Sequence, residues 1–343
     1  QAHDLLVDGL HFAADDHIQV DAGHTHLSTS LKDLQKLGVD AVAVAAGDTA
    51  ITVDLGADGS FDLAGGVTSF LGGDSVDVTL NVDGTSQVSE LAALSGVEGV
   101  DLHALGIDHV NLSFGDTDLA DLLNSDSVLN ADIDAIKLES VSVGGTIDLA
   151  DTSIVNLSQA QAHDLLLDGL HFAADDHNIG LSVSAAEGTH LSTSLKDLQK
   201  LGVDAVAVAG ADAASVDSIS IDLGSEGTLS VDGLPMFASD DITVTLDVAN
   251  ADQLGEVANL ALTDNVDLHA IGLDNVELIL NGQDQLSGLL NDVHLDAELQ
   301  AVRNDDLSIS TIDMVTTDTV KLSDAQAHDL LVDGLHFAAD DHI

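Results

Sequence analysis

The chain has 343 residues, of which 45% are hydrophobic, yet it contains only seven Phe and neither Trp nor Tyr. Seven basic residues against 61 acidic ones give a formal net charge of −54, which excludes nucleic-acid binding and disfavours an anionic membrane surface. Eight of the acids are Glu and 53 are Asp, a residue typical of turns and of calcium ligands. Such a charge needs screening by divalent cations or high salt.

Cysteine is absent, so disulfides and thiolate metal sites are excluded. This usage suits a protein that is exported unfolded. No apolar run approaches the roughly 18 residues needed to span a bilayer, and we expect no membrane insertion. Because Gln1 is not an initiator residue, we expect the chain to be an excerpt of a longer tandem array.

Long internal repeats dominate the sequence. QAHDLLVDGLHFAADDHI at residues 1–18 recurs letter for letter at 326–343, and 161–177 differ from it only by Leu167 in place of Val7. THLSTSLKDLQKLGVDAVAVA also occurs twice, at 25–45 and 189–209. These identities predict three segments: a first long repeat at 1–160, a second at 161–325 and the start of a third at 326–343.

The repeated opening stretch predicts a short helix followed by a strand-like segment. Ser158 with Gln161, and Ser323 with Gln326, match the S-x-x-Q capping box that starts a helix. The helix should end at an Asp-Gly pair such as Asp8-Gly9, and LHFAADDHIQV should continue as a strand with a turn.

The next unit predicts a second helix, beginning at Ser28 or Thr29 and ending at Gly38. Its leucines, Leu31, Leu34 and Leu37, fall on one face, and Leu34 and its counterpart Leu198 should be core residues. VDAVAVA then switches to the period of a strand. Strands with tight turns should follow at 51–63 and 218–231.

The remaining units combine strands with leucine-bearing helices. The third should pass from the strand at 76–82 into a helix with Val88, Leu91 and Leu94. The fourth should carry Leu119, Leu122 and Leu123 on a helix, matched by Leu286, Leu289 and Leu290. Units of about 40 residues with this alternation predict an α/β fold of tandem helix-plus-strand repeats with at least partly parallel strands, solenoid-like or stacked as repeat domains.

Aspartate is abundant enough to indicate a metal site, because calcium takes six to eight oxygen ligands and Asp-rich turns provide them. Further acids follow a turn and an apolar residue, at Asp40, Asp108, Asp204 and Asp274. All of these could equally be turn and cap residues on a solvated acidic face. The candidate calcium ligands are Asp15, Asp16, Asp54, Asp58, Asp62, Asp175, Asp176, Asp340 and Asp341.

Histidine recurs in each copy of the opening stretch, as at His3, His11 and His17, but spacings of eight and six do not match a transition-metal site. Exposed or edge positions are the better interpretation. No GxSxG elbow, phosphate-binding Gly-Lys loop or Cys-His pair is present, and a single Arg leaves little to bind an anionic substrate. We therefore expect no enzyme.

The near-identical repeats, Asp-rich and Cys-free composition and scarcity of basic residues resemble the repeat regions of very large secreted bacterial surface proteins. These are adhesin-like or filament-forming proteins of the type I secretion style, which fold outside the cell with calcium. The resemblance implies a structural segment of an extracellular filament, biofilm matrix or surface array that associates with neighbouring copies of itself. The alternative is a calcium-dependent adhesin or ligand-binding module.

Overall fold

The computed structural model describes most of the chain, namely residues 2–13, 16–22, 25–44, 49–57, 69–71, 76–95, 102–124, 127–138, 140–149, 154–184, 189–208, 217–225, 227, 229, 234–237, 242–263, 266–315, 320–339 and 341. They form two compact units. The first unit comprises 1–153 and 164–176, and the second comprises 154–163 and 177–343. The middle copy of the opening stretch is thus divided, and its residues 164–176 group with the first unit.

The described helices are short, and several begin and end at the expected signals. In both copies of the LKDLQKL helix a serine is the N-cap, Ser30 or Ser194, and a left-handed glycine follows the last turn. Ser30 therefore replaces the predicted start at Ser28 or Thr29. The helices are α1 Ala2–Val7, α2 Leu31–Leu37, α3 Gly84–Ser95, α4 Asp116–Leu122, α5 Val128–Lys137, α6 Gln159–Leu167, α7 Leu195–Leu201, α8 Ala251–Ala261, α9 Gln283–Leu290, α10 Leu295–Asn304 and α11 Asp324–Val332.

The predicted capping boxes are confirmed. Ser323 Oγ accepts the Gln326 N–H at 3.2 Å, and Gln326 Oε1 accepts the Ser323 N–H at 3.0 Å. Ser158 and Gln161 make the same two bonds at the start of the α6 helix. Two helices were not predicted, α5 and α10, which follow α4 and α9 after short connections.

Every described strand pair is parallel. The first unit contains the sheets β1-β3-β5 and β2-β4-β6-β7-β8-β10, and the second contains β9-β11-β13-β15 and β12-β14-β16-β17-β18-β19. The strands are β1 Gln19–Ala22, β2 His26–Leu27, β3 Ala41–Val44, β4 Ala50–Asp54, β5 Ser69–Leu71, β6 Asp77–Asp83, β7 His109–Phe114, β8 Ser142–Ile147, β9 Val155–Leu157, β10 Leu170–Phe172, β11 Ile179–Val183, β12 His190–Leu191, β13 Ala205–Val208, β14 Ser218–Asp222, β15 Met236–Phe237, β16 Thr243–Val248, β17 Asn275–Leu280, β18 Ser308–Met314 and β19 His336–Phe337.

The strands within each sheet follow one another in chain order. In the six-stranded sheet of the second unit, Ser220 pairs with Thr245, Thr245 with Asn275 and Asn275 with Ser308, which are 25, 30 and 33 residues apart. This spacing is shorter than the predicted unit of about 40 residues. The α/β class and the parallel strands are confirmed.

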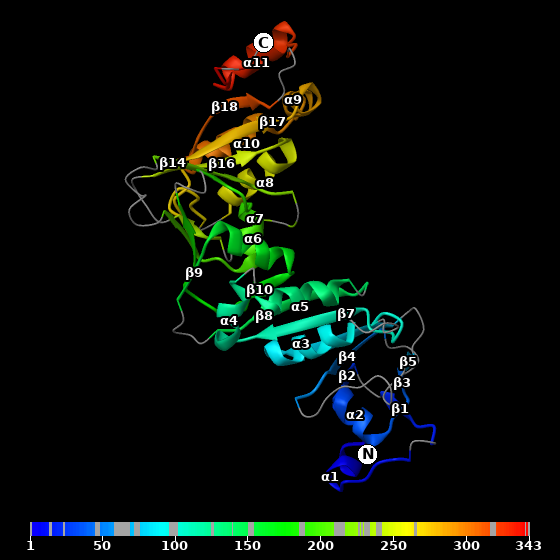
Figure 1. The fold of residues 1–343 in the computed structure, drawn as a ribbon. Coiled ribbons are helices and arrows are strands. Elements are labelled where there is room, and N and C mark those ends of the chain that lie inside the picture. Colours follow the sequence, from blue (N-terminus) through cyan, green and yellow to red (C-terminus); the bar gives the residue numbers. More distant parts are fainter. Residues whose placement is uncertain are drawn as a thin grey trace. The chain divides into compact units, whose positions relative to one another are not determined.

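The core consists of aliphatic side chains from alternate strand positions and from the leucine faces of the helices. On β4, Ile51 and Val53 are buried, as are Leu80 and Val82 on β6. Helix α8 lies beside α10, which packs on β18, and these elements can be followed in Figure 1. Leu34 and Leu198 are both 0% exposed, which confirms their predicted place in the core.

The three copies of the opening stretch differ in what covers them. Leu170 is 1% exposed and Leu335 is 3% exposed, because β10 pairs with β8 and β19 pairs with β18. Leu10, the same residue of the first copy, is 55% exposed, and residues 10–13 lie outside any strand. This leucine is therefore buried only in the two copies whose strand pairs with a preceding strand.

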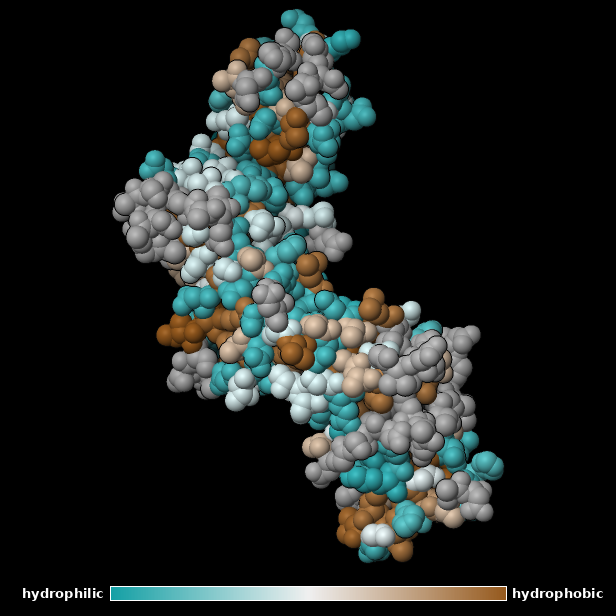
Figure 2. Space-filling view, in the orientation of Figure 1, coloured by the Kyte–Doolittle hydropathy of each residue, from teal (hydrophilic) through white to brown (hydrophobic). Residues whose placement is uncertain are grey.

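Hydrophilic side chains occupy much of the face drawn in Figure 2, and the apolar ones gather in separate patches. Exposed apolar residues include Val128, Leu138 and Val293. None of the helices in the described ranges has the length and apolar character required to cross a membrane.

Candidate functional site

Four of the aspartates that follow an apolar residue after a turn link the start of their own strand to the start of the preceding strand in the same sheet. The Asp274 N–H donates to the Val244 carbonyl oxygen at 2.9 Å, and Asp274 Oδ2 accepts the Val244 N–H at 2.8 Å. We call this reciprocal pair of bonds an aspartate clamp. It closes the start of the ladder between β16 and β17, where a strand-end N–H would otherwise need another partner. The other clamps join Asp40 to Ile18, Asp108 to Val78 and Asp204 to Ile179.

Three candidate calcium ligands prove to be turn-closing residues. Asp176 is buried, and its two carboxylate oxygens accept the Leu149 and Ala173 N–H groups at 2.9 and 3.1 Å. Asp341 likewise accepts N–H groups from a preceding strand end and from its own turn. Asp16 Oδ2 accepts the Ala13 N–H at 3.1 Å. These bonds give Asp16, Asp176 and Asp341 a structural role whether or not a cation also binds.

The other candidate ligands are scattered. Asp54 lies on β4, where Asn81 Nδ2 donates to it at 2.9 Å, and Asp175 is exposed in a turn. Within the parts of the chain that the structure describes, no three His, Asp or Glu side chains are placed to hold a metal ion together. The candidates that lie outside the described residues are Asp15, Asp58, Asp62 and Asp340.

The histidines of the repeated stretch are exposed, as predicted for edge positions. His171 alternates along β10 with buried Leu170 and Phe172. The exposed members of the described set are His11, His17, His163, His171, His177, His328 and His336. The side chains of His3, His24 and His342 lie outside the described residues.

A buried ion pair in each repeat was not predicted. Lys196 on α7 is 7% exposed, and its Nζ lies 2.7 Å from Oε2 of Glu256 on α8. Glu256 Oε1 also accepts the Leu229 N–H at 2.7 Å. The first repeat contains the same pair, Lys32 with Glu90 at 2.6 Å. Both lysines belong to the LKDLQKL motif, whose other lysine, Lys200 in the second copy, is exposed.

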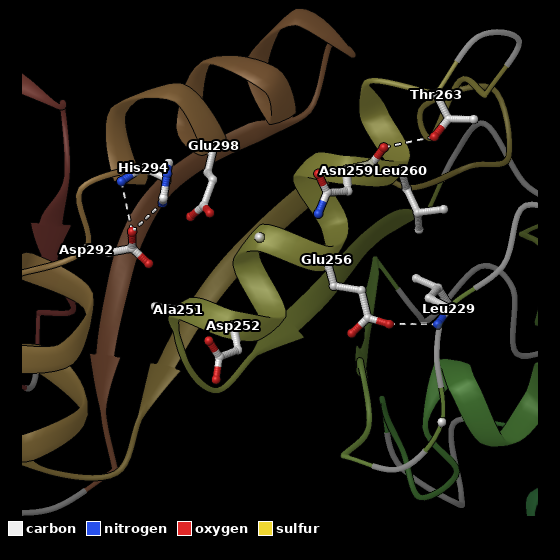
Figure 3. Close-up of a pocket in the computed structure, with 12 residues that line it drawn as sticks. Leu229, Ala251, Asp252, Glu256, Asn259, Leu260, Thr263, Asp292, His294 and Glu298 are labelled. Atoms are coloured by element: carbon white, nitrogen blue, oxygen red, sulfur yellow. Dashed lines mark hydrogen bonds and ion pairs between the residues drawn. The ribbon is translucent and has the colours of Figure 1, made fainter.

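Beside Glu256 the second unit has a cavity of about 800 Å³. Figure 3 shows Glu298 of α10 directed toward α8, with Glu256 on the far side next to Leu229. The lining residues are Gly227, Leu229, Ala251, Asp252, Gly255, Glu256, Asn259, Leu260, Thr263, Asp292, His294 and Glu298. Four carboxyl groups therefore line one cavity, and Asp292 Oδ1 lies 3.4 Å from His294 Nδ1.

Glu298 differs from its counterpart in the first repeat. There, Asp132 Oδ2 accepts a hydrogen bond from Ser89 Oγ at 2.6 Å. The second repeat has Gly255 in place of Ser89, and a Cβ at Gly255 would lie only 2.9 Å from Glu298 Oε1. Glu298 Oε2 is buried and makes no hydrogen bond. Comparing the two repeats position by position would have identified this pair of substitutions from the sequence.

The electrostatics of the cavity favour a cationic or hydrogen-donating group. Burial raises the pKa of Glu298, nearby Asp292 and Asp252 raise it further, and His294 opposes them. No protein-family model, curated protein or solved structure matches the chain.

Proposed function

We propose that this chain is a structural repeat segment of an extracellular filament, matrix or surface array. Its coils stack as a solenoid, neighbouring copies associate with one another, and calcium screens the acidic surface. The chain order of the strands carries the proposal. In both six-stranded sheets each new coil adds its strand beside the strand of the coil before. Added coils then lengthen the sheets instead of enlarging one globule.

The aspartate clamps support this function because they recur at the same step of the coil in both repeats. They join residues 22 to 30 positions apart in the chain, so each clamp holds adjacent coils together. The chain has 53 Asp, of which the clamp residues bond to the backbone and many others add negative charge to the surface. The resulting charge of −54 opposes lateral association until cations screen it.

Negative-stain electron microscopy of the native material and of the 343-residue chain tests this function. Samples dialysed at low salt into EDTA, millimolar calcium or molar sodium chloride should give fibres with calcium and dispersed particles with EDTA. Monodisperse globules in all three conditions would eliminate the filament function. Fibres that form in sodium chloride but not in calcium would show that assembly needs general screening of the acidic charge rather than calcium. That result would indicate a halophilic repeat protein.

The cavity beside α8 favours the second candidate, a calcium-dependent ligand-binding module. If it accepts calcium, Glu298→Gln should weaken calcium binding at least tenfold in isothermal titration calorimetry, because the unpartnered carboxylate oxygen is lost. Asp132→Asn is the matched control, since Ser89 already bonds that carboxylate. Equal affinity in both variants and the parent chain would remove this candidate.

A further inference from the structure

The six-stranded sheet of the second unit carries a row of acids in direct register. Asp222 on β14 pairs with Asp247 on β16, and Asp247 pairs with Glu277 on β17. We call these three residues the carboxylate ladder. Neighbouring strands lie about 4.8 Å apart, and like charges directly opposite each other destabilise a sheet. The ladder therefore opposes the pairing of its own strands whenever all three groups are ionised.

The first repeat has amides at two of these three positions. Asp54 pairs with Asn81, and Asn81 pairs with Asn111. Asn81 Nδ2 donates to Asp54 Oδ1 at 2.9 Å, and Asn111 Nδ2 donates to Asn81 Oδ1 at 3.2 Å. The same row of the same kind of sheet is thus joined by hydrogen bonds in one repeat and crowded with carboxylates in the other. The two repeats form an internal comparison within one chain.

Ionisable groups face the ladder from the strands on both sides. On β12, His190 Nε2 lies 3.5 Å from Asp222 Oδ2, and His190 Nδ1 lies 3.6 Å from Asp247 Oδ2. On β18, Asp313 interacts with Glu277. In the first repeat the counterpart of His190 is His26, whose Nε2 lies 3.6 Å from Asp54 Oδ2. The residue beside Asp54 in that row is the amide Asn81 instead of a second carboxylate.

Asp247 is the least exposed member of the ladder, with 9% of its side chain accessible. Burial is the largest cause that raises the pKa of Asp247 to about 6; Asp222 and Glu277 raise it as well, while His190 and Ser220 oppose the rise. Burial and Asp313 also raise the pKa of Glu277. A proton on Asp247 removes the central charge and creates an O–H donor in the middle of the ladder.

We propose that the carboxylate ladder is a pH-sensitive element, which tightens the β14-β16-β17 sheet in mildly acidic conditions and loosens it at neutral pH. The folded state binds the Asp247 proton more tightly than the unfolded chain, whose pKa is near 3.8. The stabilisation is therefore complete below that value and is lost as the pH rises through about 6. The amide row of the first repeat lacks this response.

Hydrogen exchange of the full chain, measured by mass spectrometry at pH 5.0 and 7.5 and corrected for intrinsic exchange, tests the proposal. Protection of the β16 peptide (243–248) should fall about tenfold more than that of the β6 peptide (77–83). In Asp247→Asn the extra fall should vanish, with β16 protected at both pH values. In Asn81→Asp it should appear in β6 as well.

An equal pH response of β16 in the parent chain and in Asp247→Asn would overturn the proposal. So would an Asn81→Asp variant whose β6 peptide responds no differently from the parent. Because β6 and β16 belong to different units, an effect of pH on the whole second unit is recognised from Asp247→Asn, in which it would persist, whereas an effect of the ladder would not. The measurement is independent of whether the protein forms filaments.

Discussion

Leu335→Ala should destabilise the second unit by about 2–5 kcal/mol, whereas Leu10→Ala should change stability by less than about 0.5 kcal/mol. The two leucines occupy the same position in two identical eighteen-residue stretches, 1–18 and 326–343. Leu335 is buried beside β18, and Leu10 is exposed. The difference therefore isolates the contribution of packing beside a preceding strand, because helix and strand propensities and the local sequence are matched.

Urea unfolding followed by circular dichroism measures this difference. Leu170→Ala provides a second comparison: it should lower the midpoint of the first unit, to which residues 164–176 belong, and leave the second unit unchanged. If Leu10→Ala and Leu335→Ala shift the urea unfolding curve equally, Leu335 does not pack beside β18 as described.

Lys196→Ala should cost about 3 kcal/mol, and Lys200→Ala should cost almost nothing. Lys196 is buried against Glu256, so its removal leaves a partly buried carboxylate without its cation. Lys200 lies four residues further along the same helix and is exposed. Chemical denaturation of the two variants at equal ionic strength gives the comparison.

A double variant shows how much of this loss comes from the unpaired charge. Lys196→Met with Glu256→Gln should recover a large part of the stability lost in Lys196→Ala, because no charge is then left alone. The Lys32–Glu90 pair should behave in the same way in the first repeat. A loss in Lys200→Ala as large as that in Lys196→Ala would contradict the buried ion pair.

The sequence was informative wherever the controlling contacts are local. The leucines of LKDLQKL, the Ser–Gln capping boxes and the helix-ending Gly38 act over three or four residues, and each appears as predicted apart from the exact start of α2. Helices α5 and α10 were not predicted. The run IDAIKL at 133–138 has the composition of a strand but forms the end of α5, and α10 begins after His294 without a side-chain cap bond.

The long-range contacts could not be predicted in the same way. The pattern of an apolar residue, Asp and a strand marked Asp274, but its partner Val244 lies 30 residues earlier, and only the sheet register identifies it. Lys196 and Glu256 are 60 residues apart, and both read as surface residues in a chain with so many acids. The substitutions at Glu298 and Gly255 are visible when the two repeats are aligned, but their contact depends on the packing of α10 beside α8.

The aspartate clamps also bear on how such a chain changes over generations. Each clamp joins the start of a strand only to the start of the preceding strand in its sheet, 22 to 30 residues earlier, so no clamp depends on residues further away in the chain. Unequal recombination between the letter-for-letter copies at 1–18 and 326–343 would insert or delete a whole number of coils and leave every clamp with its partner. Gain or loss of whole repeats by this route would therefore separate none of these aspartates from the strand to which it bonds.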